Sequence, residues 1–216
     1  MATIDLEHPR GQITDVEMFH QIVKKSIMGI LLGLESLTGK ISTKDPNFSE
    51  TPDRVARAYV EAFEGMFDDG QKVRAILGRK FPFPEKNSEM IVVGPVHVWS
   101  ICAHHLLPVE MDVWLGYLPK KYILGLSKLA RLAEQLAKKP GLQEGVTSEI
   151  ADALYGELKS KGSACLIRGR HLCMAMRGVK KEAITTTTQL RGAFLKSEVR
   201  QEFLAAVRAD VGNGKV

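Results

Sequence analysis

The sequence predicts an α+β fold with hairpin-paired antiparallel strands and helices on one face of the sheet. Two observations lead to this. Helical and extended apolar patterns follow one another as two helices, two strands, two helices, two strands and one helix. The composition, 44% hydrophobic and 25% charged, is globular and excludes a disordered, collagen-like or coiled-coil chain. At 216 residues, we expect one domain plus an extension.

The N-terminal part is expected to be an arm followed by two helices. Residues 1–13 show little periodicity. A capping box from Thr14 to Glu17 opens the first helix. The second begins at Thr51, with Thr51 as cap and the following proline in the first turn. Residues 68–88 contain glycines and prolines and are expected to form a loop.

Extended and helical segments then alternate. The extended segments are rich in β-branched and aromatic residues and are predicted as strands. They cover residues 90–93, 96–102, 111–118, 163–176 and 183–194. The helical segments place apolar residues on one side. They cover residues 127–139, residues 147–158 and a last helix capped by Ser197.

Charge and hydropathy restrict the classes of function. The net charge of +5 allows an anionic partner without identifying one. No aromatic-rich basic stripe suggests nucleic-acid binding. No run approaches the ~20 apolar residues of a membrane span, so we expect no membrane partner. The N-terminus lacks the apolar segment of a secretion signal, and the expected location is cytoplasmic.

The cysteines are either packing residues or metal ligands. Three is an odd number, and a chain of this size needs no disulfide framework. Cys165 and Cys173 lie eight residues apart on one predicted strand, roughly 26 Å at ~3.3 Å per residue. Cys165 therefore cannot join a site at Cys173, and we predict that it packs in the core.

Two short segments predict a metal centre. Cys102 and His105 have the two-residue gap that allows two ligands to share one zinc ion. His171 and Cys173 are two apart on a predicted strand and share a face. Cys102, His105 and Cys173 would leave a fourth position for water, as in catalytic zinc sites. His104 and His171 would then shuttle protons. The alternative is that all five are packed core residues.

Several cations are candidates for binding an anion. Lys128 and Arg131 are neighbours on a predicted helix, and Ser127 opens that helix with free amides. Arg177 lies four residues beyond the last predicted ligand, roughly 13 Å along a regular strand and within reach of a phosphate tail. Arg54 lies in the first turns of the second helix. Each of these is alternatively a solvated surface charge.

Gln143 and Glu144 lie at the start of a helix or in its lead-in. A carboxylate can accept two hydrogen bonds from the edge of a guanine. The alternative is an ordinary solvated turn.

In their order, these segments resemble the GTP cyclohydrolase I family over about residues 14–209. The matching stretches are residues 50–54, 102–108, 125–131, 143–147, 170–174, 176–178, 185–188 and 200–204.

The resemblance implies a tunnelling fold: an antiparallel four-stranded sheet with two helices on one face. Residues 1–88 would form the arm and helical extension, and residues 89–216 the catalytic domain. Family members form toroidal homodecamers with active sites at subunit boundaries. Their reaction opens the imidazole ring of GTP at C8, releases formate and closes a pterin ring, giving 7,8-dihydroneopterin triphosphate on the way to folate or other pterins.

The resemblance also implies a role for each matching residue. Zinc would be held by Cys102, His105 and Cys173. His104 and His171 would transfer protons. The residues implied to hold the substrate are Ser127, Lys128, Arg131 and Arg177 for the triphosphate, with Arg54 in addition, and Glu144 with Gln143 for the guanine.

One departure concerns Ala103, where the family usually has glutamate. The missing carboxylate is not a zinc ligand, so metal binding is expected to survive, with an altered rate or substrate preference. The competing interpretations are a zinc- and guanine-nucleotide-binding regulatory subunit and a relative with different chemistry, such as a deazapurine nitrile reductase. The latter would need a nucleophilic cysteine outside a metal site.

Overall fold

The computed structural model describes residues 14–83 and 89–212, and the expected arm at residues 1–13 lies outside them. The chain divides into two compact units, with the boundary between Phe63 and Glu64. None of the described helices is long and apolar enough to cross a bilayer.

The first unit contains three helices: α1 (Asp15–Thr38), α2 (Pro46–Ser49) and α3 (Thr51–Ala62). The capping box at the start of α1 is confirmed, since the Glu17 N–H donates to Thr14 Oγ1 at 3.2 Å and Glu17 Oε2 accepts from the Thr14 N–H at 2.9 Å. Helices α1 and α3 pack together, with Lys24 bonded to Asp53 at 3.2 Å. The predicted cap of α3 is wrong: Glu50 is the N-cap and Thr51 is the first helical residue.

In the second unit, the region predicted as a loop is largely structured. After a 3₁₀ turn (η1, Glu64–Phe67), helix α4 (Gln71–Gly78) and strand β1 (Lys80–Pro82) lie there. Glycines at both ends of α4 suggested a loop, whereas Leu77 is only 3% exposed and packs in the core. Burial of this apolar face therefore outweighs the weak local helix signal. The remaining part of the predicted loop, residues 84–88, lies outside the described residues.

The main sheet has the strand order β5-β2-β3-β6-β7. Its long strands are antiparallel neighbours: β2 (Ile91–Cys102), β3 (Pro108–Leu118), β6 (Gly162–His171) and β7 (Ile184–Gly192). The two extended segments noted over residues 90–102 form one strand, with a register shift between Val93 and Val96. The prediction of four strands is corrected to five, because β5 (Pro140–Gly141) pairs in parallel with the end of β2. A separate two-stranded sheet joins β1 to β4 (Tyr122–Leu124).

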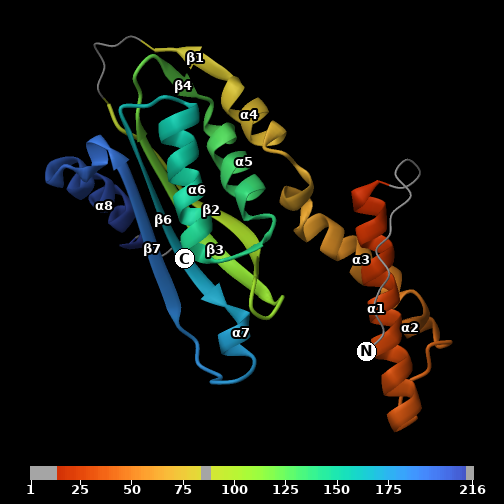
Figure 1. Cartoon of the computed structure of the whole chain (residues 1–216). Helices are drawn as coiled ribbons and strands as arrows, with labels where there is room; N and C mark the ends of the chain where they lie inside the picture. The colour runs from red at the N-terminus through yellow and green to blue at the C-terminus, as the bar shows by residue number, and fades with distance from the viewer. Residues whose placement is uncertain (1–13, 84–88, 213–216) are drawn as a thin grey trace. The chain divides into compact units, whose positions relative to one another are not determined.

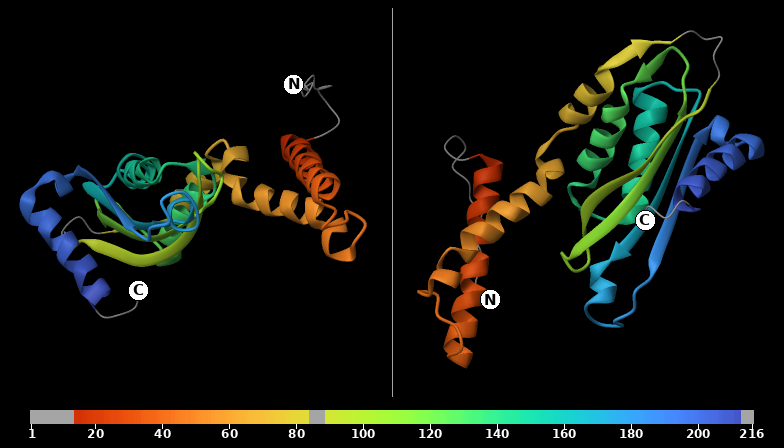
Figure 2. Two further views of the ribbon diagram at one scale, coloured as in Figure 1. Left: turned by 90° about the horizontal axis from the view of Figure 1, so that it is seen from below. Right: turned by 180° about the vertical axis from the view of Figure 1, so that it is seen from behind.

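Helices cover both faces of the main sheet (Figures 1 and 2). Helices α5 (Leu126–Ala137) and α6 (Gln143–Asp152) pack on one face, and α6 continues as a π-helical turn, η2 (Ala153–Glu157). Helix α8 (Ser197–Gly212), reached through the 3₁₀ turn η3 (Ala193–Leu195), covers part of the other face over Trp114 and Leu166. The alternation of side chains along the strands provides apolar residues for both layers. The predicted α+β class is therefore confirmed, whereas the prediction of helices on one face alone is corrected, because α8 covers apolar residues on the other face.

Two helix and strand boundaries near Cys173 and Gln143 differ from those predicted. The strand predicted to reach residue 176 ends at His171, and Leu172–Ala175 forms a short helical turn, α7. The helix predicted to begin at residue 147 begins at Gln143. Both differences matter, because they alter where Cys173 and Gln143 direct their side chains.

Candidate metal centre and active site

Cys102, His105 and Cys173 come together at one end of the sheet. Cys102 is the last residue of β2, His105 lies in the turn that follows, and Cys173 is in α7, directly after β6. Strands β2 and β6 run in the same direction on either side of β3. Their C-terminal ends therefore lie at the same end of the sheet. The spatial grouping is as predicted. The reason is different, because Cys173 projects from a helical turn and does not share a strand face with His171.

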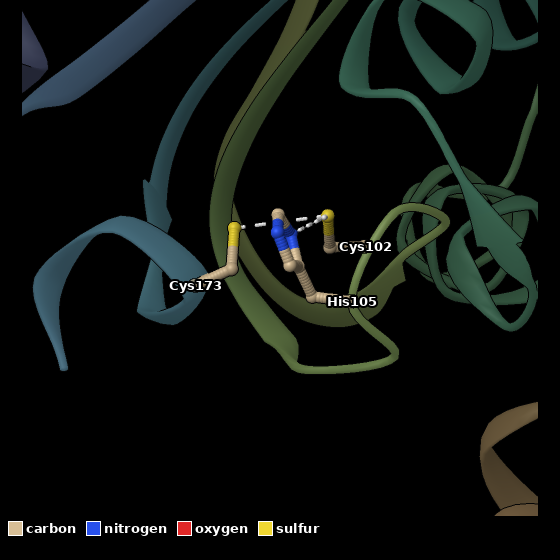
Figure 3. A group of neighbouring side chains, drawn as sticks. All are labelled: Cys102, His105 and Cys173. Carbon is tan, nitrogen blue, oxygen red and sulfur yellow. Dashed lines mark hydrogen bonds between the residues drawn. The ribbon is translucent and has the colours of Figure 1, made fainter. Parts of the chain in front are cut away.

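The spacing of these three side chains fits a tetrahedral metal ion. Cys102 Sγ lies 3.7 Å from Cys173 Sγ and 3.8 Å from His105 Nδ1, and all three ligand atoms lie within 4.8 Å of one another (Figure 3). Zn–S bonds of ~2.3 Å at tetrahedral angles separate two sulfurs by roughly 3.8 Å. Two soft thiolates and an imidazole are also the donors that zinc prefers.

The thiols of this group differ from the third cysteine in their surroundings. Burial and the adjacent Cys102 thiol raise the pKa of Cys173, because two thiolates this close repel each other. A divalent cation between the sulfurs removes that penalty. Cys165 is fully buried in the core, and burial alone raises its pKa. This is the packing position predicted for it.

The two remaining histidines lie beside the ligand group. The ring of His104 is exposed, and its centroid is 6.2 Å from that of His105. His171 ends β6, two residues before Cys173, and its Nε2 lies 3.1 Å from Gln143 Oε1. Burial lowers the pKa of His171, and the Glu144 carboxylate partly offsets this. The site therefore combines a metal-ligand group with two imidazoles.

The predicted guanine-binding pair has two different environments. Glu144 is exposed in the first turn of α6, close enough to interact electrostatically with His171. Gln143 is 4% exposed, and its side-chain amide is hydrogen-bonded within the chain. Of the two side chains, only that of Glu144 is open to a ligand.

Lys128 and Arg131 line a pocket of about 460 Å³ between α4 and α5. Arg79 lines the same pocket, and among the described residues none of these three cations forms an ion pair. The pocket's other two lysines pair with Glu64. The excess of unpaired positive charge makes this pocket suitable for a polyanion.

Ser127 and Lys128 lie away from Cys102, His105 and Cys173 of the same chain. The C-terminal end of α5 lies beside the end of β2, where Ser100 Oγ donates to the Lys139 carbonyl at 3.2 Å. Ser127 is exposed at the opposite end of the helix, about 15 Å away at 1.5 Å per residue. A single chain therefore brings the ligands and histidines together but does not add Ser127 and Lys128 to them.

The other two predicted anion-binding residues are also exposed. Arg177 follows α7, and its charge acts on the nearby Cys173. Because the strand ends at His171, the distance predicted from a regular strand does not apply. Arg54 belongs to the first unit, where its guanidinium pairs with Glu50 at 3.0 Å and donates to the Asn47 carbonyl at 3.2 Å.

Comparison with known proteins identifies the family. Residues 34–208 match GTP cyclohydrolase I. The chain belongs to the GTP cyclohydrolase I family. It is 45% identical over 165 residues to GTP cyclohydrolase 1 of Corynebacterium glutamicum (strain R), covering 75% of this chain and 78% of the relative. It is 38% identical over 198 residues to GTP cyclohydrolase 1 of Dehalococcoides mccartyi (strain BAV1), covering 87% and 96%.

Among solved structures, the apo form of the archaeosine synthase QueF-Like aligns with a TM-score of 0.38 at 9% identity, over 50% of this chain and 95% of that one. A similarity this low adds nothing to the family assignment.

Sequence reasoning missed two features of the site. It did not predict that Gln143 would be buried against β6 and β7, nor that Gly169 would contact it closely. A glycine inside a strand often marks the close approach of another group, and this was the available signal. The partner could not be inferred, because Gln143 is distant in sequence.

Proposed function

We propose that this chain opens the imidazole ring of GTP at C8 by zinc-dependent hydrolysis, releases formate and closes the pterin ring of 7,8-dihydroneopterin triphosphate. The observation that carries the proposal is the group Cys102, His105 and Cys173, with two histidines beside it, in a chain of this family. We further propose that the sheet and its helices form a tunnelling fold, with the catalytic domain in residues 89–216 and the extension in residues 1–88.

Cys102, His105 and Cys173 would hold zinc, with a fourth position open to the reaction. When bound, zinc supplies Lewis-acid activation of water at neutral pH. Burial lowers the pKa of His171, which favours the neutral imidazole that can accept a proton. His104, whose ring lies near that of His105, would supply or remove protons at the purine nitrogens as the ring opens and the pterin closes.

Substrate recognition divides between the two ends of the nucleotide. Glu144 would accept hydrogen bonds from the guanine N1–H and its 2-amino group. The triphosphate would be held by cations and by helix-terminal amides. The residues proposed for this are Ser127, Lys128, Arg131 and Arg177, with Arg54 as an additional candidate.

The active form would be a homo-oligomer, a decamer in the arrangement implied by the family. Two observations support association. Ser127 and Lys128 begin α5, and about 15 Å of helix separates them from the end of α5 that lies beside β2, so residues of a second copy would complete the site. Ile30, Leu34 and Leu37 also share a face of α1 and are 58%, 46% and 87% exposed. A cytoplasmic location, where GTP is available, completes the proposal.

The direct test is incubation of the pure protein with GTP and zinc. We expect formate release and pterin fluorescence, both lost after chelation and restored by added zinc. GTP binding without turnover would favour the alternative, a regulatory subunit, which Ala103 motivates. Ala103 is exposed in its turn and leaves room for a longer side chain, so Ala103→Glu would then be expected to raise turnover.

Substitution of Lys128 tests the triphosphate site. Lys128→Gln removes an unpaired cation from the anion pocket. KM for GTP is expected to rise about 10-fold with little change in kcat, because a desolvated charge-assisted hydrogen bond contributes ~1.5 kcal/mol. Steady-state kinetics measures this. Arg74→Gln is the matched control, since Arg74 is an exposed cation on α4 that does not line the pocket. Equal effects of the two variants would contradict a specific site.

A further inference from the structure

Gln143 lies at the active site without facing the substrate. It is the first residue of α6, next to the exposed Glu144, and only 4% of its surface is accessible. A buried amide must find internal partners for two donors and an acceptor. Its partners therefore indicate what it does.

The nitrogen of the Gln143 amide faces the sheet. Nε2 lies 3.2 Å from the Ile167 carbonyl, 3.0 Å from the Thr185 carbonyl and 3.0 Å from Thr187 Oγ1. Carbonyl oxygens only accept, so the amide can take only the orientation that directs its NH₂ group toward β6 and β7. This leaves Oε1 on the opposite side, toward His171.

The oxygen of the amide assigns the tautomer of His171. Gln143 Oε1 lies 3.1 Å from His171 Nε2. Since Oε1 can only accept, Nε2 must carry the hydrogen. In the neutral ring, Nδ1 is then the nitrogen with a free lone pair. Gln143 thus fixes both the orientation of the imidazole and the nitrogen that it offers to the reaction.

Two threonines hold Gln143 in this position. The Thr147 hydroxyl donates to the Gln143 backbone carbonyl at 2.6 Å. Its single hydrogen is then used, so in the 2.7 Å contact between the two hydroxyls, Thr187 Oγ1 must donate to Thr147 Oγ1. Thr187 Oγ1 remains free to accept from Gln143 Nε2. The direction of both hydroxyl hydrogen bonds is thus defined, and the three acceptors around Nε2 restrict the amide to one orientation.

Gly169 provides the space that this arrangement needs. A Cβ added there would lie 2.1 Å from Gln143 Oε1 and 3.0 Å from its Cδ. Any other residue at position 169 would displace the amide from His171. The strand, the threonines and the glycine thus converge on the contact between Gln143 and His171.

We propose that Gln143 is a positioning residue, which holds His171 as the Nε2–H tautomer with Nδ1 available to the reaction, while the neighbouring Glu144 alone of the pair reads the guanine through its side chain. This rests on the proposed function for the role of His171. The tautomer itself is a property of the resting protein and can be measured without turnover.

Kinetics of matched variants separates the two roles. Gln143→Met keeps the volume of the side chain and removes its polar contacts. We expect kcat to fall about 10- to 100-fold, the range seen when an orienting partner is lost. KM for GTP and zinc content should stay within about twofold of the unmodified protein. In a His171→Ala background the same substitution is expected to change kcat by less than about twofold, because its effect acts through His171. Glu144→Gln should instead raise KM for GTP and reduce the preference for GTP over ITP, which lacks the 2-amino group.

Two further variants test whether a loss of kcat in Gln143→Met comes from misfolding. Thr187→Val removes one acceptor at nearly constant shape, and Gly169→Ala displaces the amide while leaving Gln143 and His171 chemically intact. Both are expected to lower kcat more than they change KM. Nitrogen-15 solid-state NMR of histidine-labelled protein should find the hydrogen of His171 on Nε2, and a mixed population of tautomers in Gln143→Met.

Three results would overturn the inference. They are a Gln143→Met protein that loses discrimination against ITP at unchanged kcat, an equal loss of kcat in the His171→Ala background, or an Nδ1–H tautomer in the unmodified protein. Absence of GTP turnover in the unmodified protein would contradict the proposed function, and the NMR result would still decide the tautomer.

Discussion

Cys173→Ser is expected to abolish stoichiometric zinc binding and to reduce GTP turnover by at least ~10³-fold, since Lewis-acid activation is worth several kcal/mol and each ~1.4 kcal/mol is tenfold. A serine hydroxyl is not a soft ligand and stays protonated at neutral pH. Cys102 and His105 would remain as two of the three donors. Metal analysis after dialysis, together with formate and pterin assays, measures both effects.

The matched control is Cys165→Ala, which removes a buried thiol from the core and leaves the ligand group intact. It should keep one zinc per chain and nearly normal turnover, with some loss of thermal stability from the small cavity. Circular dichroism should show that the Cys173→Ser protein is folded, because α7 is only a short turn at the end of β6. Full zinc retention by Cys173→Ser would exclude the proposed centre.

His104→Ala is expected to lower kcat by roughly 10²- to 10⁴-fold, the usual contribution of a general acid or base. The imidazole lies beside His105 but does not belong to the group proposed to hold zinc. Zinc content should therefore stay at the unmodified level, and KM for GTP should change little. This combination of results separates a proton-transfer role from a ligand role.

His97→Ala is the control for this histidine. His97 is on β2, five residues before Cys102 and about 16 Å along the strand. Its ring contacts Asp112 at 3.2 Å and Glu110 at 3.6 Å, and it should be dispensable for turnover. Similar losses in the two variants, or loss of zinc from His104→Ala, would contradict a specific proton-transfer role for His104.

Much of the site was predictable from the sequence because its signals are local. A two-residue gap between a cysteine and a histidine brings two ligands together whatever the surrounding fold. The capping box at Thr14 depends only on residues three apart, and the structure contains it. The α+β class followed from the alternation of helical and extended periods, which the backbone itself imposes.

The remaining features depended on packing between distant segments. Local residues around α4 suggest a loop, and the burial of Leu77 makes it a helix. The period of the strand through His171 gives no sign that the chain turns at residue 172. Gln143 resembles an ordinary solvated residue until α6 packs on β6 and β7.

The sequence by itself predicted the grouping of Cys102, His105 and Cys173 and the class of fold, because these rest on residue chemistry and short spacings. Tertiary structure alone decided how Cys173 reaches Cys102, which of Gln143 and Glu144 is exposed, and which nitrogen of His171 lies against Gln143. The physical reason is that these depend on strand register and on the hydrogen-bonding needs of a buried amide, which must be satisfied by groups 24 to 44 residues away.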